Sequence, residues 1–248
     1  MPELHPIHSS WDHRPPEITT QTRLIHKWKN VLFCPVQAWN RPPAAAIHNR
    51  AGPFNIILEA RIFRMEEKVR TLSKLFANHF TAQLDTVRLR TGKITERLKI
   101  DHPEAAAVLP FLDTENILMV RQWRYAIARE TLEIPAGKAD PGEDLLTCAR
   151  RELLEETGYH ARHIIPIFSY HPAIGYSNEV IQIYAAAGLT RVSETQDVDE
   201  ISRLEIVPLA QLQDLIRTGV ISDGKTVIGV SLFRARQVHG EVPADFFT

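Results

Sequence analysis

The stretch that decides the fold is GKADPGEDLLTCARRELLEETGY, residues 137–159. Pro141-Gly142 predicts a turn, and Asp144 belongs to the residue types that favour the N-cap of a helix. Gly158 stands where a glycine commonly follows the last helical residue. The pattern therefore predicts a helix over 144–157.

Two faces of this helix have different characters. At about 100° per residue, Leu146, Ala149 and Leu153 share one face, which we expect to pack on a sheet. Glu152, Glu155 and Glu156 lie at i, i+3 and i+4 on a neighbouring face, where like charges repel. A divalent cation would reverse that sign, since Mg²⁺ and Mn²⁺ prefer carboxylate oxygens shared with phosphate. The alternative is a solvated acidic face on which nearby arginines pair locally.

The wider segment resembles the Nudix box, G-x5-E-x7-R-E-U-x-E-E-x-G-U, where U is apolar. All fixed positions match: Gly137, Glu143, Arg151, Glu152, Glu155, Glu156 and Gly158. Leu153 stands at the first apolar position, and the aromatic Tyr159 stands at the last. Seven residues at roughly 7% usage each give a chance match of about 10⁻⁸ per start position.

The resemblance implies an α/β (α+β) fold, a Nudix-type α/β/α sandwich with a mixed sheet, that hydrolyses a nucleoside diphosphate linked to another group. It implies metal ligation by Glu152 and Glu156, with Glu155 beside them as a ligand or catalytic group and with the Ala136 carbonyl. Arg151 would orient the carboxylates through Glu143, and Gly137 would let the backbone approach closely. Metal ions would neutralise the pyrophosphate and lower the pKa of the attacking water.

The segments on either side of the box narrow the choice of substrate. Residues 120–125 (VRQWRY), 129–137 (RETLEIPAG) and 170–179 (YHPAIGYSNE) resemble segments of ADP-ribose pyrophosphatases, and the resemblance extends over about 84–236. It implies that Arg97 and Arg124 contact phosphates or the terminal ribose, although both are also compatible with solvated strand edges. Glu133 would hold a ribose hydroxyl or pair internally with an arginine. Trp123 and Tyr125 are alternatively core aromatics.

The general base is expected in the acidic loop at residues 197–201. In the family, such a loop brings a carboxylate over the bound pyrophosphate. Glu200 and Asp199 are the first candidates, ahead of Asp197, and a merely solvated loop is the alternative. The base must lie within hydrogen-bond reach of the water, which sequence cannot establish. The histidines show no zinc-binding spacing.

The rest of the chain predicts a mixed sheet with few helices. A short helix is expected over 66–75, and a hairpin of strands 84–89 and 94–100 around Thr91-Gly92. Further strands are expected over 105–111, 117–121, 131–134, 164–170, 180–187 and 202–207, with helices over 209–218 and 224–236. We expect a poorly ordered N-terminal extension (1–64), N-terminal elements that include a dimerisation surface (65–103), and a hydrolase domain (104–240).

Composition excludes several classes of protein. The 248 residues carry a net charge of −1 and no run of 18 apolar residues, so nucleic-acid binding and membrane spanning are not expected. The two cysteines, Cys34 and Cys148, exclude a disulfide framework and favour a cytoplasmic location. Residues 1–64 hold eight of the 16 prolines and eight basic against four acidic side chains. Met65 is therefore an alternative start.

The expected activity is Mg²⁺-dependent hydrolysis of ADP-ribose to AMP and ribose 5-phosphate, with Mn²⁺ as an alternative metal. The same chemistry on GDP-mannose, ADP-glucose or NADH is the nearest rival. A non-catalytic sensor of ADP-ribose is a rival of another class, although such regulators usually lose a box glutamate, and all four are present here. The resemblance also implies a homodimer joined through residues 84–106, with Arg97 reaching across.

Overall fold

The computed structural model describes residues 65–77, 79–192 and 201–248. The strands in these ranges form three sheets. The N-terminal sheet is antiparallel and contains β1 (Glu66–Ala77), β2 (Phe80–Leu89) and β3 (Ile94–Asp101). The second sheet is also antiparallel, in the order β10 (Ile201–Pro208), β5 (Asn116–Arg124), β6 (Arg129–Glu133). The third is mixed, in the order β7 (Ala136–Lys138), β4 (Ala105–Pro110), β9 (Ile181–Arg191), β8 (Tyr159–Tyr170).

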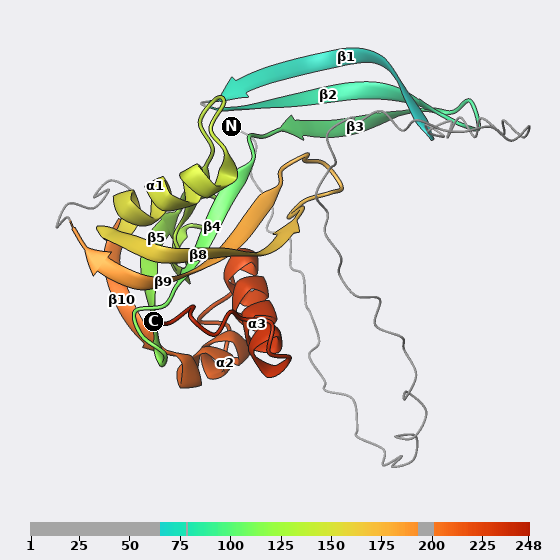
Figure 1. Ribbon diagram of the computed structural model, residues 1–248. Coiled ribbons are helices and arrows are strands. Elements are labelled where there is room, and N and C mark those ends of the chain that lie inside the picture. Colours follow the sequence, from blue (N-terminus) through green and yellow to red (C-terminus); the bar gives the residue numbers. More distant parts are fainter. Residues whose placement is uncertain (1–64, 78, 193–200) are drawn as a thin grey trace, which may run out of the picture. The chain divides into compact units, whose positions relative to one another are not determined.

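Helices cover both sides of the mixed sheet, in which β4 and β9 run parallel. One helix, α1 (Leu145–Thr157), packs against β4, β7 and β8, and α3 (Gly224–Val238) packs against β9, β8 and β4. The helices α2 (Leu209–Arg217) and α3 lie on the opposite side from α1 (Figure 1). A short 3-10 turn, η1 (Tyr125–Ile127), follows β5. The expected α/β sandwich with a mixed sheet is confirmed.

Strand β4 shows why the fold has two cores. Its alternate residues Ala106 and Val108 pack with Cys148, Ala149 and Leu153 of α1. Ala107 and Leu109 point to the other side, into a larger apolar cluster that α2 and α3 help to close. A strand buried on both faces is a continuous apolar run, as in the sequence AAAVLP. This burial fixes β4, and with it the adjacent β7.

One expected element is wrong. Residues 66–75 were predicted to form a helix, but they belong to the strand β1, which pairs antiparallel with β2. Two register shifts, between Lys68 and Arg70 and between Thr71 and Ser73, interrupt the alternation that marks a strand. Pairing with β2 also outweighs the helix propensity of the Glu, Lys and Leu residues. The predicted hairpin around Gly92 is confirmed, with Gly92 at φ +83°.

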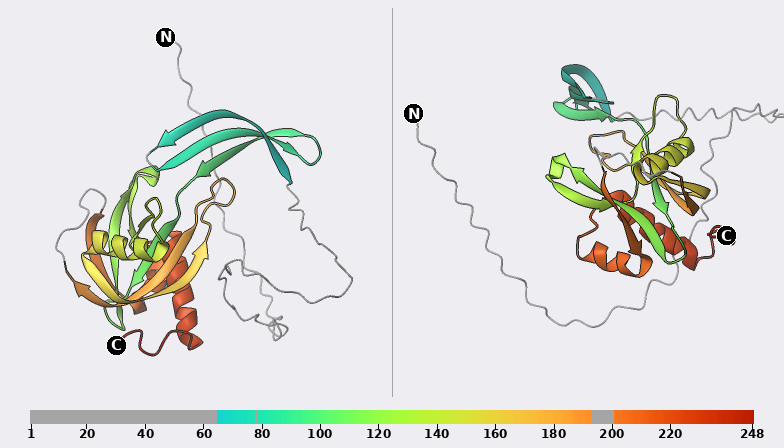
Figure 2. Two further views of the ribbon diagram at one scale, coloured as in Figure 1. Left: turned by 45° about the horizontal axis from the view of Figure 1, so that its top comes forward. Right: turned by 90° about the vertical axis from the view of Figure 1, so that its left-hand side faces the viewer.

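The three N-terminal strands form a sheet of their own (Figure 2). Its link to the rest of the chain is made by backbone hydrogen bonds, from Ile100 N to Tyr176 O at 2.7 Å and from Asn178 N to Ile100 O at 3.2 Å. No helix in the described ranges has the length and apolar character needed to cross a bilayer. The expected extension (1–64) and the acidic loop at 197–200 lie outside the described residues.

Candidate active site

Local sequence sets the limits of α1 as expected. The Asp144 carboxylate accepts hydrogen bonds from Leu146 N at 3.1 Å and Thr147 N at 3.0 Å, and so caps the helix. Gly158, at φ +75°, ends it. The expected buried face is partly wrong, because Leu146 is 40% exposed. The face that meets the sheet is rotated by one residue from the expected one. It consists of Leu145, Cys148, Ala149, Glu152, Leu153 and Glu156.

That rotation has a chemical consequence. The N-terminal half of the buried face is apolar, whereas its C-terminal half brings two carboxylates, Glu152 and Glu156, into the interior. Burial, followed by the charge of Glu152, raises the pKa of Glu156 to about 8. Burial also raises the pKa of Glu152, with Arg151 opposing the shift. Because uncompensated buried carboxylates are costly, a cation beside them would stabilise the pair.

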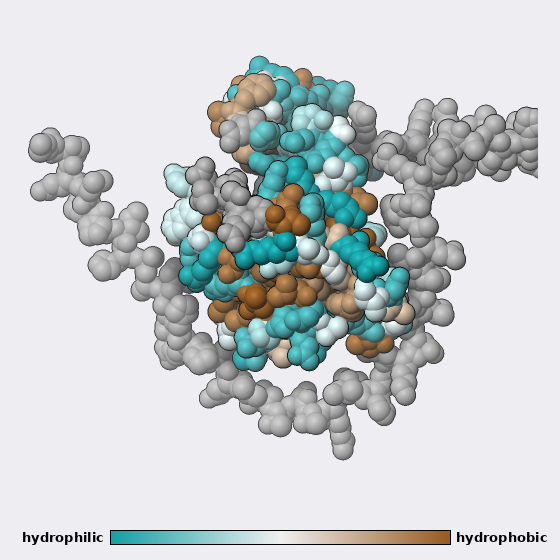
Figure 3. All heavy atoms as spheres, turned by 60° about the vertical axis from the view of Figure 1, so that its left-hand side comes forward, coloured by the Kyte–Doolittle hydropathy of each residue, from teal (hydrophilic) through white to brown (hydrophobic). Residues whose placement is uncertain are grey.

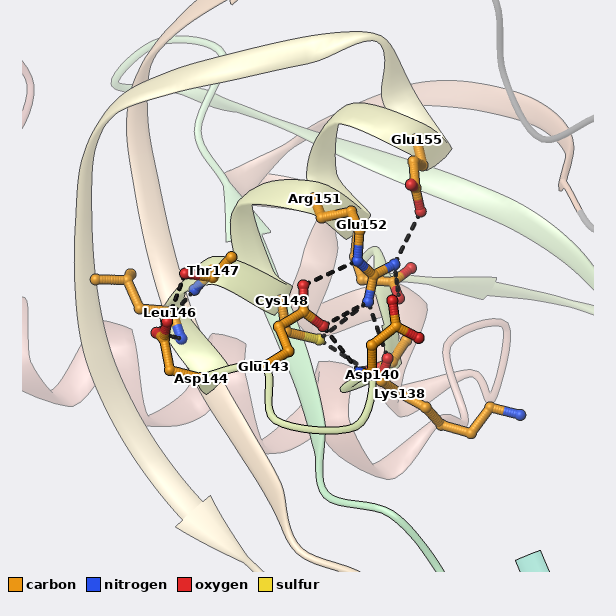
Figure 4. A network of polar contacts seen from close by, with 11 residues as sticks. Lys138, Asp140, Glu143, Asp144, Leu146, Thr147, Cys148, Arg151, Glu152 and Glu155 are labelled. Carbon is orange, nitrogen blue, oxygen red and sulfur yellow. Dashed lines mark hydrogen bonds and ion pairs between the residues drawn. The ribbon is translucent and has the colours of Figure 1, made fainter. Parts of the chain in front are cut away.

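Arg151 is the centre of a polar network that borders this face of α1 (Figure 4). Its Nε and Nη2 donate to the two oxygens of Glu143 at 3.0 and 2.9 Å, a two-point contact that lysine cannot copy. Its Nη1 donates to Glu152 at 2.8 Å and Glu155 at 2.9 Å, and its Nη2 donates to the Lys138 carbonyl at 3.0 Å. One guanidinium therefore joins the loop before α1, the helix and β7.

Strand β7 contacts the same carboxylates through its backbone. Ala136 N donates to Glu156 Oε2 at 3.0 Å. At Gly137, a Cβ atom would lie 2.1 Å from the carboxyl carbon of Glu152, so only glycine leaves room for this side chain. The strand was not predicted from sequence, yet it is the element against which the box carboxylates are placed.

Two cavities meet at β7. The smaller, of about 250 Å³, is polar and is lined by Ala136, Gly137, Lys138, Asp140, Arg151, Glu152, Glu155, Glu156, Ala139 and His79. The larger, of about 810 Å³, shares Ala136, Gly137 and Lys138 with it and extends to Arg124, Tyr170, His171 and Lys225. A ligand that crosses the β7 backbone can therefore contact the carboxylates of α1 at one end and Arg124 at the other.

The donor set of the smaller cavity suits Mg²⁺ or Mn²⁺, because the carboxylates of Glu152, Glu155 and Glu156 line it together with Asp140 and β7. Across the described parts of the chain, however, no three Asp, Glu, His or Cys side chains converge on one point. In this arrangement Arg151 engages Glu152 and Glu155, while Glu156 faces Ala136 N. A metal ion bound here would share these carboxylates with the guanidinium or displace it from them.

The predicted substrate residues separate into two groups. Arg124, at the end of β5, lines the larger cavity and makes a two-point contact with Glu133, from Nε at 2.8 Å and Nη2 at 2.6 Å. Glu133 is almost fully buried, so internal pairing, one of its two sequence alternatives, is what the structure contains. Arg97 lies on β3, where it pairs with Glu66 at 2.6 Å, and lines neither cavity of this chain. The core alternative for Trp123 and Tyr125 is wrong, because both are exposed.

Two predicted site residues lie outside the described part of the chain, and two residues that line the cavities were not predicted from the sequence. Glu200 and Asp199, the expected bases, are outside the described residues and stay predictions. His79, in the turn between β1 and β2, lines the small cavity, and no motif marks it in the sequence. Lys225 lines the large cavity and is buried, although it is the second residue of α3. Its signal in the sequence is a basic residue in the first turn of the helix predicted over 224–236.

Comparison with known proteins agrees with this geometry. Residues 101–227 match the model of the NUDIX domain. The chain is 33% identical over 175 residues to a methanol dehydrogenase activator of Bacillus methanolicus, covering 69% of this chain and 95% of that protein. It is 31% identical over 176 residues to an ADP-ribose pyrophosphatase of Bacillus subtilis, covering 70% of this chain and 95% of that protein.

The chain therefore belongs to the Nudix family. A crystal structure of an ADP compounds hydrolase superposes with a TM-score of 0.63 at 23% identity, covering 72% of this chain and 98% of that one. At this identity the superposition establishes the fold alone.

Proposed function

We propose that this Nudix hydrolase cleaves the pyrophosphate bond of ADP-ribose with Mg²⁺, giving AMP and ribose 5-phosphate. The observation that carries the proposal is the pair of cavities that share Ala136–Lys138: the box carboxylates line one, and Arg124 lines the other, together with Lys138, Lys225, Glu179 and Asp223. A nucleoside diphosphate sugar needs both: carboxylates to hold metal ions against the diphosphate, and cationic side chains for the remainder. The likeness to proteins named ADP-ribose pyrophosphatase, including one of Mycobacterium tuberculosis at 32% identity, supports this substrate.

The residues would divide the work as follows. Glu152 and Glu156, with Glu155 and the Ala136 carbonyl, would hold the metal ions, which supply charge neutralisation and a more acidic water. Arg151 would hold Glu143, Glu152 and Glu155 in place, and Gly137 would leave space for Glu152 and the substrate.

In the reaction, the oxygen of water forms a bond to one phosphorus, and the bond from that phosphorus to the bridging oxygen breaks. The leaving phosphate keeps the electron pair, and the proton of the water passes to a carboxylate base, for which Glu200 or Asp199 is proposed. Arg124, which lines the larger cavity, would contact the other phosphate or the terminal ribose. The Arg124–Glu133 pair gives that guanidinium a fixed direction.

We propose in addition a homodimer that uses the N-terminal strands. Exposed apolar side chains on β1 and β3, including Leu75, Phe76, Ile94 and Leu98, support this, because a sheet that stays in water seldom presents so many. In the upper part of Figure 3, apolar residues stand among hydrophilic ones. Arg97, which lines neither of these cavities in its own chain, would reach the partner's site. Light scattering should give twice the chain mass, and Leu98→Asp should reduce it to one chain.

The test of the activity is a panel of ADP-ribose, GDP-mannose, ADP-glucose and NADH, each with Mg²⁺ and with excess EDTA. We expect ADP-ribose to give the highest kcat/KM, with AMP and ribose 5-phosphate as products and no turnover in EDTA. Faster turnover of another compound would replace the substrate. Tight binding of ADP-ribose without hydrolysis by the metal-loaded protein would instead identify a sensor.

With only Cys34 and Cys148 in the chain, we propose that the activity is located in the cytoplasm.

A further inference from the structure

A buried lysine stands behind the arginine that lines the larger cavity. Lys225 Nζ contacts Glu133 Oε2 and lies 3.1 Å from Asp223 Oδ2, and its side chain is only 7% exposed. Glu133 comes from β6 and is 92 residues away in the sequence. Although Lys225 and Asp223 both line the larger cavity, the ammonium is paired with the carboxylates of Glu133 and Asp223.

Glu133 receives donors on both carboxylate oxygens. Oε1 accepts from Arg124 Nε at 2.8 Å and from the Thr131 hydroxyl at 2.5 Å. Oε2 accepts from Arg124 Nη2 at 2.6 Å and from Lys225 Nζ. Burial alone would raise the pKa of Glu133, but the hydrogen bond from Arg124 and the charge of Lys225 outweigh it and lower the pKa to about 2. The carboxylate is therefore ionised and fixed in direction when Arg124 meets it.

Contacts other than those of Lys225 also hold α3 in place. Asp223 caps the helix by accepting from Thr226 N at 3.0 Å and from the Thr226 hydroxyl at 2.6 Å. The same hydroxyl accepts from Ile134 N at 3.0 Å, which ties α3 to the chain just after β6. Asp223 and Thr226 thus supply the helix start and its link to the chain after β6, and Lys225 adds its contacts with Glu133 and Asp223.

We propose that Lys225 is a positioning residue, which orients Glu133 so that Arg124 presents its guanidinium to the substrate in the larger cavity. Without the lysine, Oε2 of Glu133 would keep Arg124 as its charged partner, and the carboxylate would rotate about its own side-chain bonds. Arg124, whose side chain is 38% exposed at the cavity wall, would follow it. The inference rests on the proposed function, because that assigns Arg124 to the substrate.

The test is a double-mutant cycle of Lys225→Met and Arg124→Ala. Affinity for ADP-ribose is measured by calorimetry in excess EDTA, together with kcat and KM in Mg²⁺. Loss of a charged hydrogen bond should weaken binding about tenfold to a hundredfold in Arg124→Ala. We expect about tenfold in Lys225→Met, with KM affected more than kcat, and less than a twofold further loss in the double variant. Lys225→Arg, which keeps the charge, should bind within about threefold of wild type.

Thr226→Ala is the matched control, since it removes the tie between α3 and Ile134 but leaves Lys225. It should lower Tm and change the dissociation constant less than twofold. Additive losses in the double variant would overturn the inference, because Lys225 would then act without Arg124. If Lys225→Met does not fold, the cycle uses Lys225→Gln, and a coupling below twofold refutes the inference. If GDP-mannose is the better substrate, it becomes the probe, so the substrate assignment fails separately from the coupling.

Discussion

Gly137→Ala is a small change at the point where β7 meets the box helix. The added methyl would lie 2.1 Å from the carboxyl carbon of Glu152, and 2.1 and 2.3 Å from its two oxygens. Because a relaxed contact between carbon atoms needs about 3.5 Å, the carboxylate must move by about 1.4 Å or more. Gly137 does not have a positive φ, so alanine adds no backbone strain there.

The displaced group is the end of a flexible side chain, which makes the effect selective. Loss of the Arg151–Glu152 contact, in a partly exposed network, should cost about 1 kcal/mol or less. That corresponds to about 2–4 °C in Tm for a chain of this size. A shift of about 1 Å in a group that positions the reaction can cost about a hundredfold in rate. We therefore expect kcat for ADP-ribose to fall at least about a hundredfold in a protein that remains folded.

The assay compares kcat in Mg²⁺ with Tm from thermal unfolding for wild type, Gly137→Ala and Gly175→Ala. Gly175 is the matched control, because a Cβ there meets no atom within 4 Å and its φ is not positive. Its variant should retain both kcat and Tm. Full activity in Gly137→Ala would refute the placement of Glu152 in the reaction, and so would a loss of activity that merely parallels unfolding.

Three further changes test neighbouring parts of the site. Burial raises the pKa of Glu156 from 4.5 to about 8, so the stability from its protonated form is complete below about pH 4.5 and is lost as the pH rises through 8. In EDTA at pH 9, Glu156→Gln should therefore unfold at a higher temperature than wild type, and near pH 4.5 the two should unfold at the same temperature. In Mg²⁺, kcat of this variant should fall by orders of magnitude. Equal unfolding temperatures at both pH values would contradict this expectation. Arg151→Lys cannot reproduce the two-point contact with Glu143, so kcat/KM should fall at least about tenfold, and wild-type kinetics would show that the network is not needed. Asp144→Ala removes the N-cap of α1 and should lower Tm by about 2–4 °C with kcat unchanged; an unchanged Tm would contradict the capping role.

What the sequence predicted well was local. The helix over 144–157 follows from its cap at Asp144 and its terminal glycine, both of which act within a few residues. Strand β4 follows from a run of apolar residues, because a strand buried on both faces needs no alternation. By contrast, β1 was missed because its two register shifts, between 68–70 and 71–73, disrupt the period of two that identifies a strand.

The parts of the site that sequence could not predict depend on contacts between distant residues. The sequence leaves two partners open for Glu133, a ribose hydroxyl or an arginine. Only the packing of α3 against the sheet brings Lys225 to it. The rotation of α1 by one residue is also a property of packing, because Leu145 and Leu146 are equally apolar in the sequence. His79 reaches the small cavity only because of the turn between β1 and β2.

The carboxylates of α1 are expected to bind a divalent metal beside β7. The most direct test is anomalous diffraction from crystals of the full chain grown with Mn²⁺ and soaked briefly with ADP-ribose. We predict a manganese peak within about 2.0–2.3 Å of a Glu152 oxygen, in the cavity that Ala136 and Glu155 also line. A peak elsewhere in a crystal that contains bound ADP-ribose, with Arg151 still holding Glu152 and Glu155, would contradict the claim.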